Sequence, residues 1–334
     1  MNPDLPTTCP GVTARELVGA SFLLGQCESL PYRYIAETSR AQLEQYCLES
    51  LTSKITAPES GVLVGQIDGE LAGIASYGPL PWESGILGQK AMSLNLITGS
   101  SSTGRIRARL SETIAEAINI LRIRGAELVT TKTYTTETCA VHALEKHGFL
   151  LMDTVVEATY RYKSNKLPPR DPRPDGFSFR AATSSDIEEL RRVSNAAFAH
   201  HFGRFHADPM IGKEMGTRIY EEWIQACVEG WGDWIILAEN EGRIVGFSVW
   251  KKPSALELRY NLKVGHYSIG AIHPDFFGRG LFKRLTAEGM HLLKDCAEFI
   301  EGPTHIHNLP VQRGYLKLGW QIVDSRHSFH KWIK

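Results

Sequence analysis

The chain lacks every bias of composition that would assign it at once to a specialised class of protein. Lys plus Arg and Asp plus Glu both number 37 among 334 residues, so no charge excess favours nucleic acid or an anionic membrane. No apolar run approaches the ~20 residues that span a bilayer. The opening MNPDLPTTCPG has neither the basic nor the apolar segment of a secretory leader. We expect a cytoplasmic protein, monomeric or homodimeric, that binds neither nucleic acid nor membrane.

Cysteine is scarce and scattered. The six cysteines contain no C-x-x-C pair and no spacing typical of a metal site. Reduced thiols in a cytosolic protein are the simplest interpretation. We therefore expect no metal.

What the sequence does contain is an internal repeat. Gly69 and Gly242 lie 173 residues apart, as do Gly73 and Gly246. Gly148 and Gly319 lie 171 residues apart, as do Asp153 and Asp324. Such a near-constant offset indicates a duplicated domain.

A segment rich in proline and charge, KSNKLPPRDPRPDG, separates the copies and has the composition of a linker. We predict domains at 1–163 and 177–334, joined by residues 164–176. Within each copy the pattern predicts helix, helix, hairpin, strand, long helix, strand, short helix and strand. The fold class is therefore α/β (α+β), in which each copy is a mixed, mainly antiparallel twisted sheet flanked by helices.

Two segments of the second half carry the chemistry. IHPDFFGRGLFKRL (272–285) predicts a strand end, a turn and a glycine loop that opens a helix, because leucines recur at helical spacing after Gly280. Free amides at such a helix start can bind a phosphate. NLPVQRGYLKLGW (308–320) predicts a short helix over 311–318 that carries Tyr315, ends at Gly319 and returns into a strand.

In this order and spacing, the two segments resemble the acyl-CoA site of the GNAT superfamily of N-acetyltransferases. The resemblance covers both halves of the chain and implies acetyl-CoA as co-substrate. It implies that the loop binds the pyrophosphate and that the end of the preceding strand polarises the thioester carbonyl. The cofactor-binding residues so implied are Ala271, Ile272, Phe277, Gly278, Arg279, Gly280, Leu281 and Phe282.

The resemblance also implies two catalytic residues. In the family motif a tyrosine stands seven residues after an asparagine and four before a glycine, and Asn308, Tyr315 and Gly319 match that pattern. A phenol of pKa about 10 can protonate the departing thiolate without prior ionisation. For Tyr315 the alternative is a helix tyrosine that packs on the sheet. For Asn308 it is an ordinary turn residue.

The first half departs from this pattern. Its equivalent positions are Glu137, Leu144 and Gly148, so the tyrosine is absent, and the loop at 99–110 has no second glycine at the matching place. We expect the first copy to be degenerate, with a structural or substrate-shaping role.

The acceptor is predicted from a separate group of residues in the second half. The resemblance places it between the first two helices of the second copy, where polar and aromatic residues gather: Arg204, His206, Asp208, Tyr220 and Trp223. Such a set suits a ligand with negative charge and a flat ring. Together with LPWESGILGQK in the first half and SFHKW near the end, it resembles dTDP-4-amino-6-deoxyhexose N-acetyltransferases. That likeness implies a small-molecule amine acceptor of the nucleotide-linked amino-sugar class.

Alternatives remain open. The loop residues at 204–208 could be surface residues with no ligand. His305 and His307, which alternate along one expected strand, receive no role, and neither does His273. Another small amine, such as an amino-thiol conjugate, polyamine or aminoglycoside, could be the acceptor. A non-catalytic acyl-CoA sensor is the rival from outside the enzymes.

Overall fold

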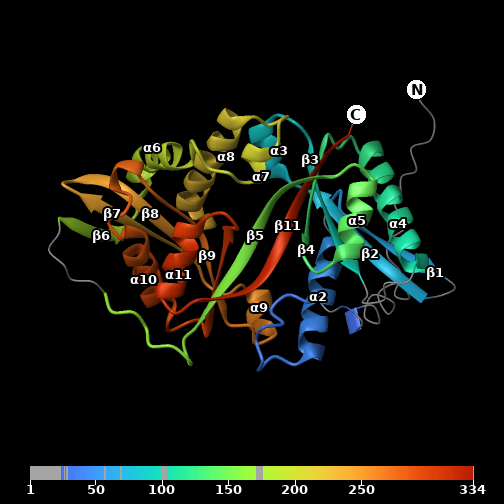
Figure 1. Cartoon of the computed structure of the whole chain (residues 1–334), viewed down its shortest axis with the longest axis horizontal. Coiled ribbons are helices and arrows are strands. Elements are labelled where there is room, and N and C mark those ends of the chain that lie inside the picture. Colours follow the sequence, from blue (N-terminus) through green and yellow to red (C-terminus); the bar gives the residue numbers. More distant parts are fainter. Residues whose placement is uncertain are drawn as a thin grey trace. The chain divides into compact units, whose positions relative to one another are not determined.

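The structure is a computed structural model of the chain. It describes residues 24–25, 27, 29–55, 58–67, 70–98, 104–170 and 176–333. The chain forms two compact units (Figure 1). Unit 1 takes in residues up to Met152 together with Arg326–Lys334, and unit 2 is Asp153–Ser325.

Unit 1 is a mixed sheet with helices packed on it. Its strands run in the order β1-β2-β3-β4-β11, where only the β3–β4 pair is parallel among the described pairings. Helix α4 packs on β1 and β2. The elements are α2 (Arg40–Ile55), β1 (Gly61–Ile67), β2 (Glu70–Pro79), α3 (Pro81–Leu87), β3 (Ala91–Thr98), α4 (Gly104–Ile123), β4 (Leu128–Tyr134), α5 (Thr138–Lys146) and the end of β11 (Gln321–Trp332).

Unit 2 repeats this plan. Its strands run in the order β5-β10-β9-β8-β7-β6, and β9 and β10 are its parallel pair. The strands are β5 (Leu150–Arg161), β6 (Phe177–Ala181), β7 (Trp234–Asn240), β8 (Arg243–Lys251), β9 (Val264–Ile272) and β10 (Phe299–His305). The helices are η1 (Ser184–Asp186), α6 (Ile187–Phe198), α7 (Arg204–Ala207), α8 (Lys213–Ala226), η2 (Cys227–Trp231), α9 (Ala255–Arg259), η3 (Pro274–Phe276), α10 (Leu281–Leu293) and α11 (Leu309–Lys317).

The core of unit 2 lies between the sheet and helices α10 and α11. Helix α10 contacts β7, β8 and β9, and α6 contacts β8 and β9. Gly289 allows the close approach of α10, because a Cβ there would stand 1.8 Å from the Trp250 indole. The predicted mixed, mainly antiparallel fold class is confirmed in both units.

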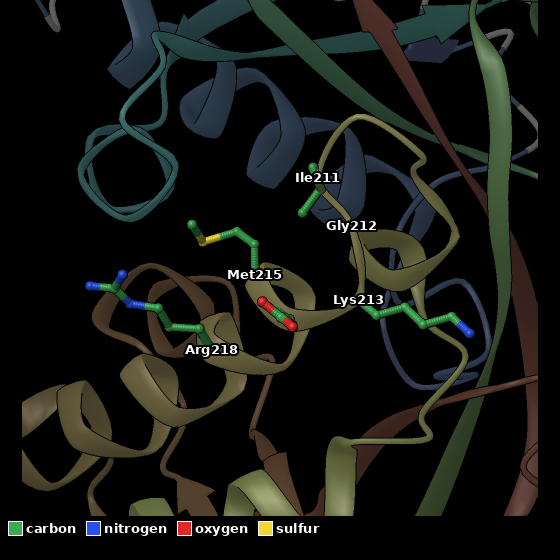
Figure 2. A pocket seen from close by; sticks show the side chains of 6 residues that line it. Ile211, Gly212, Lys213, Met215 and Arg218 are labelled. Carbon is green, nitrogen blue, oxygen red and sulfur yellow. The ribbon is translucent and has the colours of Figure 1, made fainter.

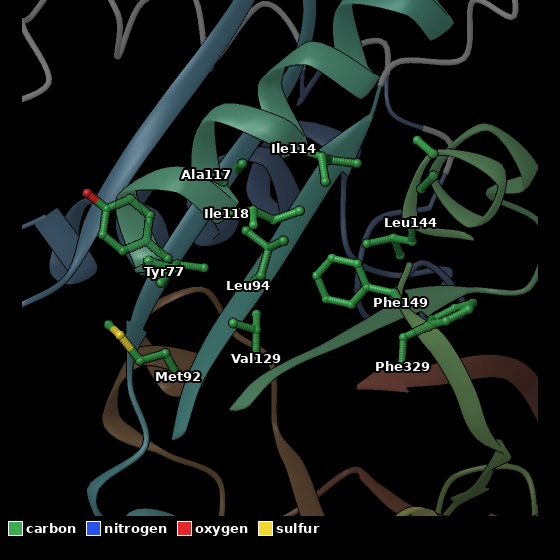
Figure 3. Close-up of a cluster of buried hydrophobic side chains, with 14 of the residues drawn as sticks. Tyr77, Met92, Leu94, Ile114, Ala117, Ile118, Val129, Leu144, Phe149 and Phe329 are labelled. Carbon is green, nitrogen blue, oxygen red and sulfur yellow. The ribbon is translucent and has the colours of Figure 1, made fainter. Parts of the chain in front are cut away.

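The closing strands do not follow the predicted boundary in the linker. The last part of β11 pairs antiparallel with β4, from Arg326 opposite Tyr134 to Trp332 opposite Leu128. Its Phe329 is fully buried in the core of unit 1, which Figure 3 shows. Conversely, β5 pairs antiparallel with β10 in unit 2. Each unit therefore takes its closing strand from the other half of the sequence. The division at 163 and 177 stays a prediction about the repeat.

The repeat is visible in the pairing registers. The parallel pair Ala91–Leu128 in unit 1 corresponds to Val264–Phe299 in unit 2, at the sequence offsets of 173 and 171. The first hairpin of each unit has an irregularity at the same place, after Gly65 and after Ala238. Two structures of one plan therefore follow from two copies of one sequence pattern.

Local signals explain the turns. The β7–β8 hairpin of unit 2 turns at Glu241 and Gly242, with φ of 50° and 78°. A two-residue β-hairpin turn requires such a pair of left-handed residues. Its counterpart at Asp68–Gly69 lies outside the described residues, as do 171–175 of the linker and 99–103 of the first loop. The short helix predicted over 311–318 begins earlier, at Leu309, because Pro310 suits the first helical turn.

Candidate functional site

The glycine loop of unit 2 has the backbone that its sequence predicts. Gly278 and Gly280 adopt φ of +77° and +76°, which side-chain-bearing residues rarely adopt. Gly280 is the N-cap of α10 and makes no side-chain cap. No heavy atom lies within 4 Å of a Cβ placed at Gly278, so conformation rather than crowding requires the glycine.

The amides of this loop are free for a ligand. Before it, the N–H groups of Phe276 and Phe277 bind the carbonyls of His273 and Pro274. After it, Arg284 N–H donates to the Gly280 carbonyl at 3.4 Å. Among the described backbone bonds outside regular elements, none uses the N–H groups of residues 278–282. The guanidinium of Arg279 stacks on Phe276 at 4.9 Å, and Phe277 is 61% exposed.

Beside the loop, β9 has an open edge. It pairs with β10 only from Val264 to His266, although it stays paired with β8 as far as Ile272. The backbone edge of residues 267–272 therefore faces no strand on the β10 side. The register with β8 slips between Tyr267 and Ile269, so Ser268 is an extra residue at the point where β9 and β10 separate.

This bulge could not be anticipated from the sequence. The amide that the resemblance assigns to the thioester carbonyl is that of Ile272, which pairs with Gly246 in the β8 ladder, with buried Ala271 beside it. No residue pattern distinguishes Ser268 from its neighbours, because a bulge is visible only in the pairing of two strands.

Tyr315 lies in the core between the sheet and α10. Its side chain is 1% exposed, stacks on Trp320 at 4.6 Å, and meets Tyr267 and Phe282 edge-on. The hydroxyl points at the strand next to the open edge, since a Cβ at Gly302 would stand 2.7 Å from it. Gly302 directly follows the last β10 residue that pairs with β9.

The hydroxyl of Tyr315 is buried without a hydrogen-bond partner in the part of the chain that the structure describes. Burial, with the neighbouring Tyr267 and Glu157, raises the pKa of Tyr315 well above its ordinary value. The phenol therefore keeps its proton at any physiological pH.

Asn308 caps the helix that carries Tyr315. It is the N-cap of α11, and its side-chain oxygen accepts from Val311 N–H at 3.5 Å. The expectation that His305 and His307 share a strand is wrong, because β10 ends at His305 and a turn follows. That turn is held by His305 Nδ1, which accepts from His307 N–H at 3.1 Å.

The predicted acceptor residues come together around Tyr220. Its ring stacks with that of His206 at 5.6 Å and with that of Trp223 at 6.0 Å. His206 Nε2 lies 3.1 Å from Thr217 Oγ1.

Two further predicted residues lie on the segment before α8, where Arg204 begins α7 and Asp208 directly follows it. The guanidinium of Arg204 lies 4.3 Å above the ring of Phe205. Asp208 is buried, and its Oδ1 accepts from Met210 N–H at 2.9 Å. Asp208 therefore shapes the loop from within.

The titratable groups here are mostly uncharged. Burial and the neighbouring His206 and His305 lower the pKa of His201 to about 4. Burial likewise lowers the pKa values of His206 and His305, and burial raises that of Tyr220. At neutral pH three histidines and a tyrosine therefore present hydrogen bonds and ring faces rather than charge.

An open pocket of about 550 Å³ lies at the start of α8 (Figure 2). Its lining residues come from one turn and the first part of the helix: Ile211, Gly212, Lys213, Glu214, Met215 and Arg218. Lys213 and Arg218 are the two basic residues among them, and each carries its charge at the end of a long side chain. The acidic Glu214 lies between them in the sequence. Sequence reasoning missed these residues, because exposed charges at a helix start have no distinctive pattern.

Several features of the unit 2 site have no counterpart in the described part of unit 1. Leu144, at the place of Tyr315, is fully buried in the unit 1 core and is labelled in Figure 3. The pairing of β2 with β3 has no slip where β8 and β9 have one. Arg109 is held by Glu112 at 3.0 Å. Glu137, at the place of Asn308, still occupies the N-cap of α5 with nearly the same φ of −82°.

Two kinds of feature are missing from the described part of the chain. No group of three or more His, Cys, Asp or Glu side chains there is arranged to hold a metal ion. Of the helices described, none combines the length and the apolar character that crossing a membrane requires.

Comparison with solved structures decides the fold. A GCN5-related N-acetyltransferase from Sphaerobacter thermophilus superimposes with a TM-score of 0.64 at 15% identity, covering 95% of this chain and 92% of that one. A tandem GNAT protein from the clavulanic acid biosynthesis pathway superimposes with a TM-score of 0.53 at 12% identity, over 95% and 94% of the two chains. The chain has the GNAT fold in tandem. The predicted resemblance to the superfamily is confirmed at the level of the fold.

The sequence relatives of the chain are distant. Spore coat polysaccharide biosynthesis protein SpsD of Bacillus subtilis is 20% identical over 317 residues, which are 90% of this chain and 98% of that protein. Mycothiol acetyltransferase of Saccharomonospora viridis is 32% identical over 165 residues, which are 47% of this chain. The match spans about half the length of that relative. No family model matches the chain.

Proposed function

We propose that the chain is an acetyl-CoA-dependent N-acetyltransferase and that unit 2 is its catalytic unit. The observation that carries the proposal is the partnerless hydroxyl of Tyr315, which faces Gly302 where β9 and β10 separate in the described structure. A buried hydroxyl without a hydrogen bond is unfavourable. A role in catalysis explains why the fold keeps it. The GNAT fold and the acetyltransferase relatives support the same conclusion.

Binding of acetyl-CoA follows from two features of the backbone. The free amides of residues 278–282 meet a pyrophosphate at the N-terminus of α10, where the helix dipole favours negative charge. The open edge of β9 offers N–H and C=O groups to the peptide-like pantetheine arm. Acetyl-CoA supplies the activated acetyl group as a thioester.

The residues of unit 2 then assist the transfer of the acetyl group. The lone pair of a neutral amine forms the new N–C bond, the C–S bond breaks, and the sulfur leaves with the electron pair. Tyr315 donates its proton to that sulfur and recovers one from solvent, while the amine nitrogen loses a proton. The amide of Ile272, at the end of β9, stabilises the negative oxygen that develops on the carbonyl. Asn308 holds the first turn of the helix that positions Tyr315.

For the acceptor, we propose a nucleotide-linked amino sugar. Arg204 supplies a positive charge for a phosphate, while His206, Tyr220 and Trp223 offer ring faces to a base or sugar. Asp208 keeps the loop in shape. Two comparisons support a sugar: SpsD is named for polysaccharide biosynthesis, and a fungal glucosamine N-acetyltransferase region superimposes with a TM-score of 0.59. That superposition covers 95% of this chain and 37% of the other, at 16% identity.

A second candidate is an amino-thiol conjugate, because mycothiol acetyltransferases are the relatives with the higher identity. Both acceptors present a primary amine on a polar carrier. They differ in that a nucleotide carries phosphate charge, which Arg204 would recognise.

The test is an acceptor screen with the full chain and acetyl-CoA, read as release of free CoA. We expect dTDP- or UDP-linked amino sugars to be acetylated, and Arg204→Ala to raise their KM steeply with little change in the KM of acetyl-CoA. Turnover of spermidine or an aminoglycoside, while all sugar nucleotides fail, would refute this acceptor. Failure to bind acetyl-CoA would refute the enzyme.

A further inference from the structure

One carboxylate of unit 2 is buried and half-satisfied. Asp153, on β5, is 9% exposed. Its Oδ2 accepts the backbone N–H of Arg204 at 2.8 Å. Its Oδ1 is buried and accepts no hydrogen bond from any residue that the structure describes. Burial of a carboxylate oxygen without a donor is costly, and none of the described residues offsets that cost by donating to Oδ1.

The position of Asp153 places it with the acceptor residues. In unit 2, β5 runs antiparallel to β10, with Val155 opposite His305, and Thr154 carbonyl accepts Ile306 N–H at 2.9 Å. Asp153 therefore lies just past the carboxyl end of β10, and its bond to Arg204 ties it to the first residue of α7.

The titratable groups on which Asp153 acts are mostly neutral. Asp153 is close enough to His201, His305 and Tyr220 to shift their pKa values upward, yet burial keeps both histidines neutral and the tyrosine protonated. The guanidinium of Arg204, stacked over Phe205, is the cation that also faces Tyr220. Within the described chain, no other Lys or Arg shifts the pKa of either histidine or of the tyrosine.

We propose that Asp153 binds the ammonium group of the acceptor, which then gives one proton to solvent so that the lone pair of the neutral amine can attack the thioester carbon. This assignment rests on the proposed function and adds the polar partner of the reacting nitrogen. A protonated primary amine has N–H donors that match the partnerless oxygen, and its charge matches the carboxylate. Arg204 and Asp153 together then recognise a zwitterionic acceptor, with phosphate on one side and ammonium on the other.

The inference also gives the first half of the sequence a part in the site. Asp153 belongs to the segment 1–163 that the repeat assigns to the first copy, but β5 completes the sheet of unit 2. The acyl-CoA loop and the proposed ammonium site therefore come from different copies of the repeat.

The test is Asp153→Asn in the full chain. Asparagine keeps an oxygen for Arg204 N–H and removes the charge. Asp324→Asn is the matched control, because Asp324 is the repeat equivalent of Asp153 and its Oδ1 accepts from the adjacent Ser325 N–H at 2.9 Å. Probes are glucosamine, a UDP-linked 4-amino sugar and spermidine, with acetyl-CoA as donor. For each amine, a compound with a hydroxyl in place of the amino group is also tested. The amine and the hydroxyl compound are compared as competitors for the acceptor site.

We expect Asp153→Asn to raise the KM of every accepted amine at least about tenfold, the scale of losing one charge-assisted hydrogen bond. The KM of acetyl-CoA and the melting temperature should stay near those of the wild type and of Asp324→Asn. In the wild type the amine should compete better than the hydroxyl compound, and Asp153→Asn should abolish that preference.

Three results would overturn the inference alone. They are an unchanged amine KM, an equal weakening of amine and acetyl-CoA, which would indicate a loop anchor, and no preference for amine over hydroxyl in the wild type. The last comparison decides the matter even if Asp153→Asn does not fold. A wild-type chain that binds no acetyl-CoA overturns the proposed function instead.

Discussion

At the scale of single residues, one position of the repeat holds an apolar side chain in the first copy and a polar hydroxyl in the second. Leu144 and Tyr315 occupy equivalent places in two cores, and both are buried. The leucine fills space at no polar cost, whereas the tyrosine brings a hydroxyl that no described neighbour satisfies. A packing role alone would favour leucine or phenylalanine at both places.

Tyr315→Phe tests this difference. We expect turnover to fall on the order of 10²–10⁴-fold, the scale for loss of a general acid, with little change in acetyl-CoA affinity. The melting temperature should be unchanged or slightly higher, because a partnerless polar group is removed. Because the pKa of Tyr315 is raised well above 10, the wild-type rate should not fall from phenol ionisation as pH rises to about 10.

Tyr160→Phe is the control, since Tyr160 lies opposite Ile300, where β10 is still paired with β9, and its hydroxyl donates to the Asn165 carbonyl at 3.3 Å. It should lose a little stability and no rate. A Tyr315→Phe enzyme with wild-type turnover across the pH range would exclude Tyr315 as the acid.

His266 offers a second test at this scale. Burial alone would lower its pKa, but the hydrogen bond to Glu257 at 2.9 Å and the charges of Glu257 and Glu301 outweigh burial and raise it. A raised folded pKa means that this contact stabilises the chain fully below the ordinary histidine pKa of about 6.5, and loses its effect as pH rises through the raised value.

We therefore expect His266→Gln to cost more unfolding free energy near pH 6 than near pH 9. Urea unfolding of both proteins at the two pH values measures the difference. If the loss of unfolding free energy in His266→Gln is equal at the two pH values, or larger at pH 9, the ion pair does not form.

At the scale of elements, the loop before α10 shows how conformation and binding can be separated. Gly280 and Gly242 have nearly the same φ, +76° and +78°, and a Cβ placed at either position would have no heavy atom closer than 3.9 Å. A side chain therefore imposes similar backbone strain at both places, of about 1–2 kcal/mol. Only Gly280 stands in front of the amides of residues 278–282.

Gly280→Val and Gly242→Val form a matched pair. Both should lower the free energy of unfolding by a similar amount, about 1–2 kcal/mol or somewhat more for a branched side chain. Titration calorimetry should show that Gly280→Val loses acetyl-CoA binding and that Gly242→Val retains it. Equal acetyl-CoA affinity in the two folded variants would rule out the loop as the pyrophosphate site.

At the scale of the whole molecule, each compact unit depends on a strand from the other half of the sequence. Without β5, the β10 edge of unit 2 has no partner, and without β4 the end of β11 has none. Unpaired edges of this length expose backbone groups and favour aggregation.

We therefore predict that a fragment of residues 153–325 folds better than one of residues 177–334, although the second follows the repeat boundary. Solubility, circular dichroism and urea unfolding would compare the two with the full chain. Cooperative unfolding of 177–334 with the same midpoint as 153–325 would contradict the strand exchange.

Much of the fold and part of the site could be predicted from the sequence, because their signals are local. Gly278 and Gly280 indicate a glycine loop that opens a helix, and the segment 308–320 indicates a short helix followed by Gly319. Both depend on the conformational preferences of a few neighbouring residues. The antiparallel hairpin at Glu241–Gly242 is of the same kind. The offsets of 173 and 171 indicate the duplication by direct comparison of the two halves of the sequence.

Tertiary structure alone decided the features that join distant segments. The bulge at Ser268 exists only in the register of two strands, and the exchange of β5 and β11 only in the choice of partners. Two copies of one pattern offer the closing strands equivalent edges, so local preference cannot tell which edge each strand takes. Because β5 completes the sheet of unit 2, Asp153 lies with the acceptor residues of the second copy. None of the residues described donates to its Oδ1 there.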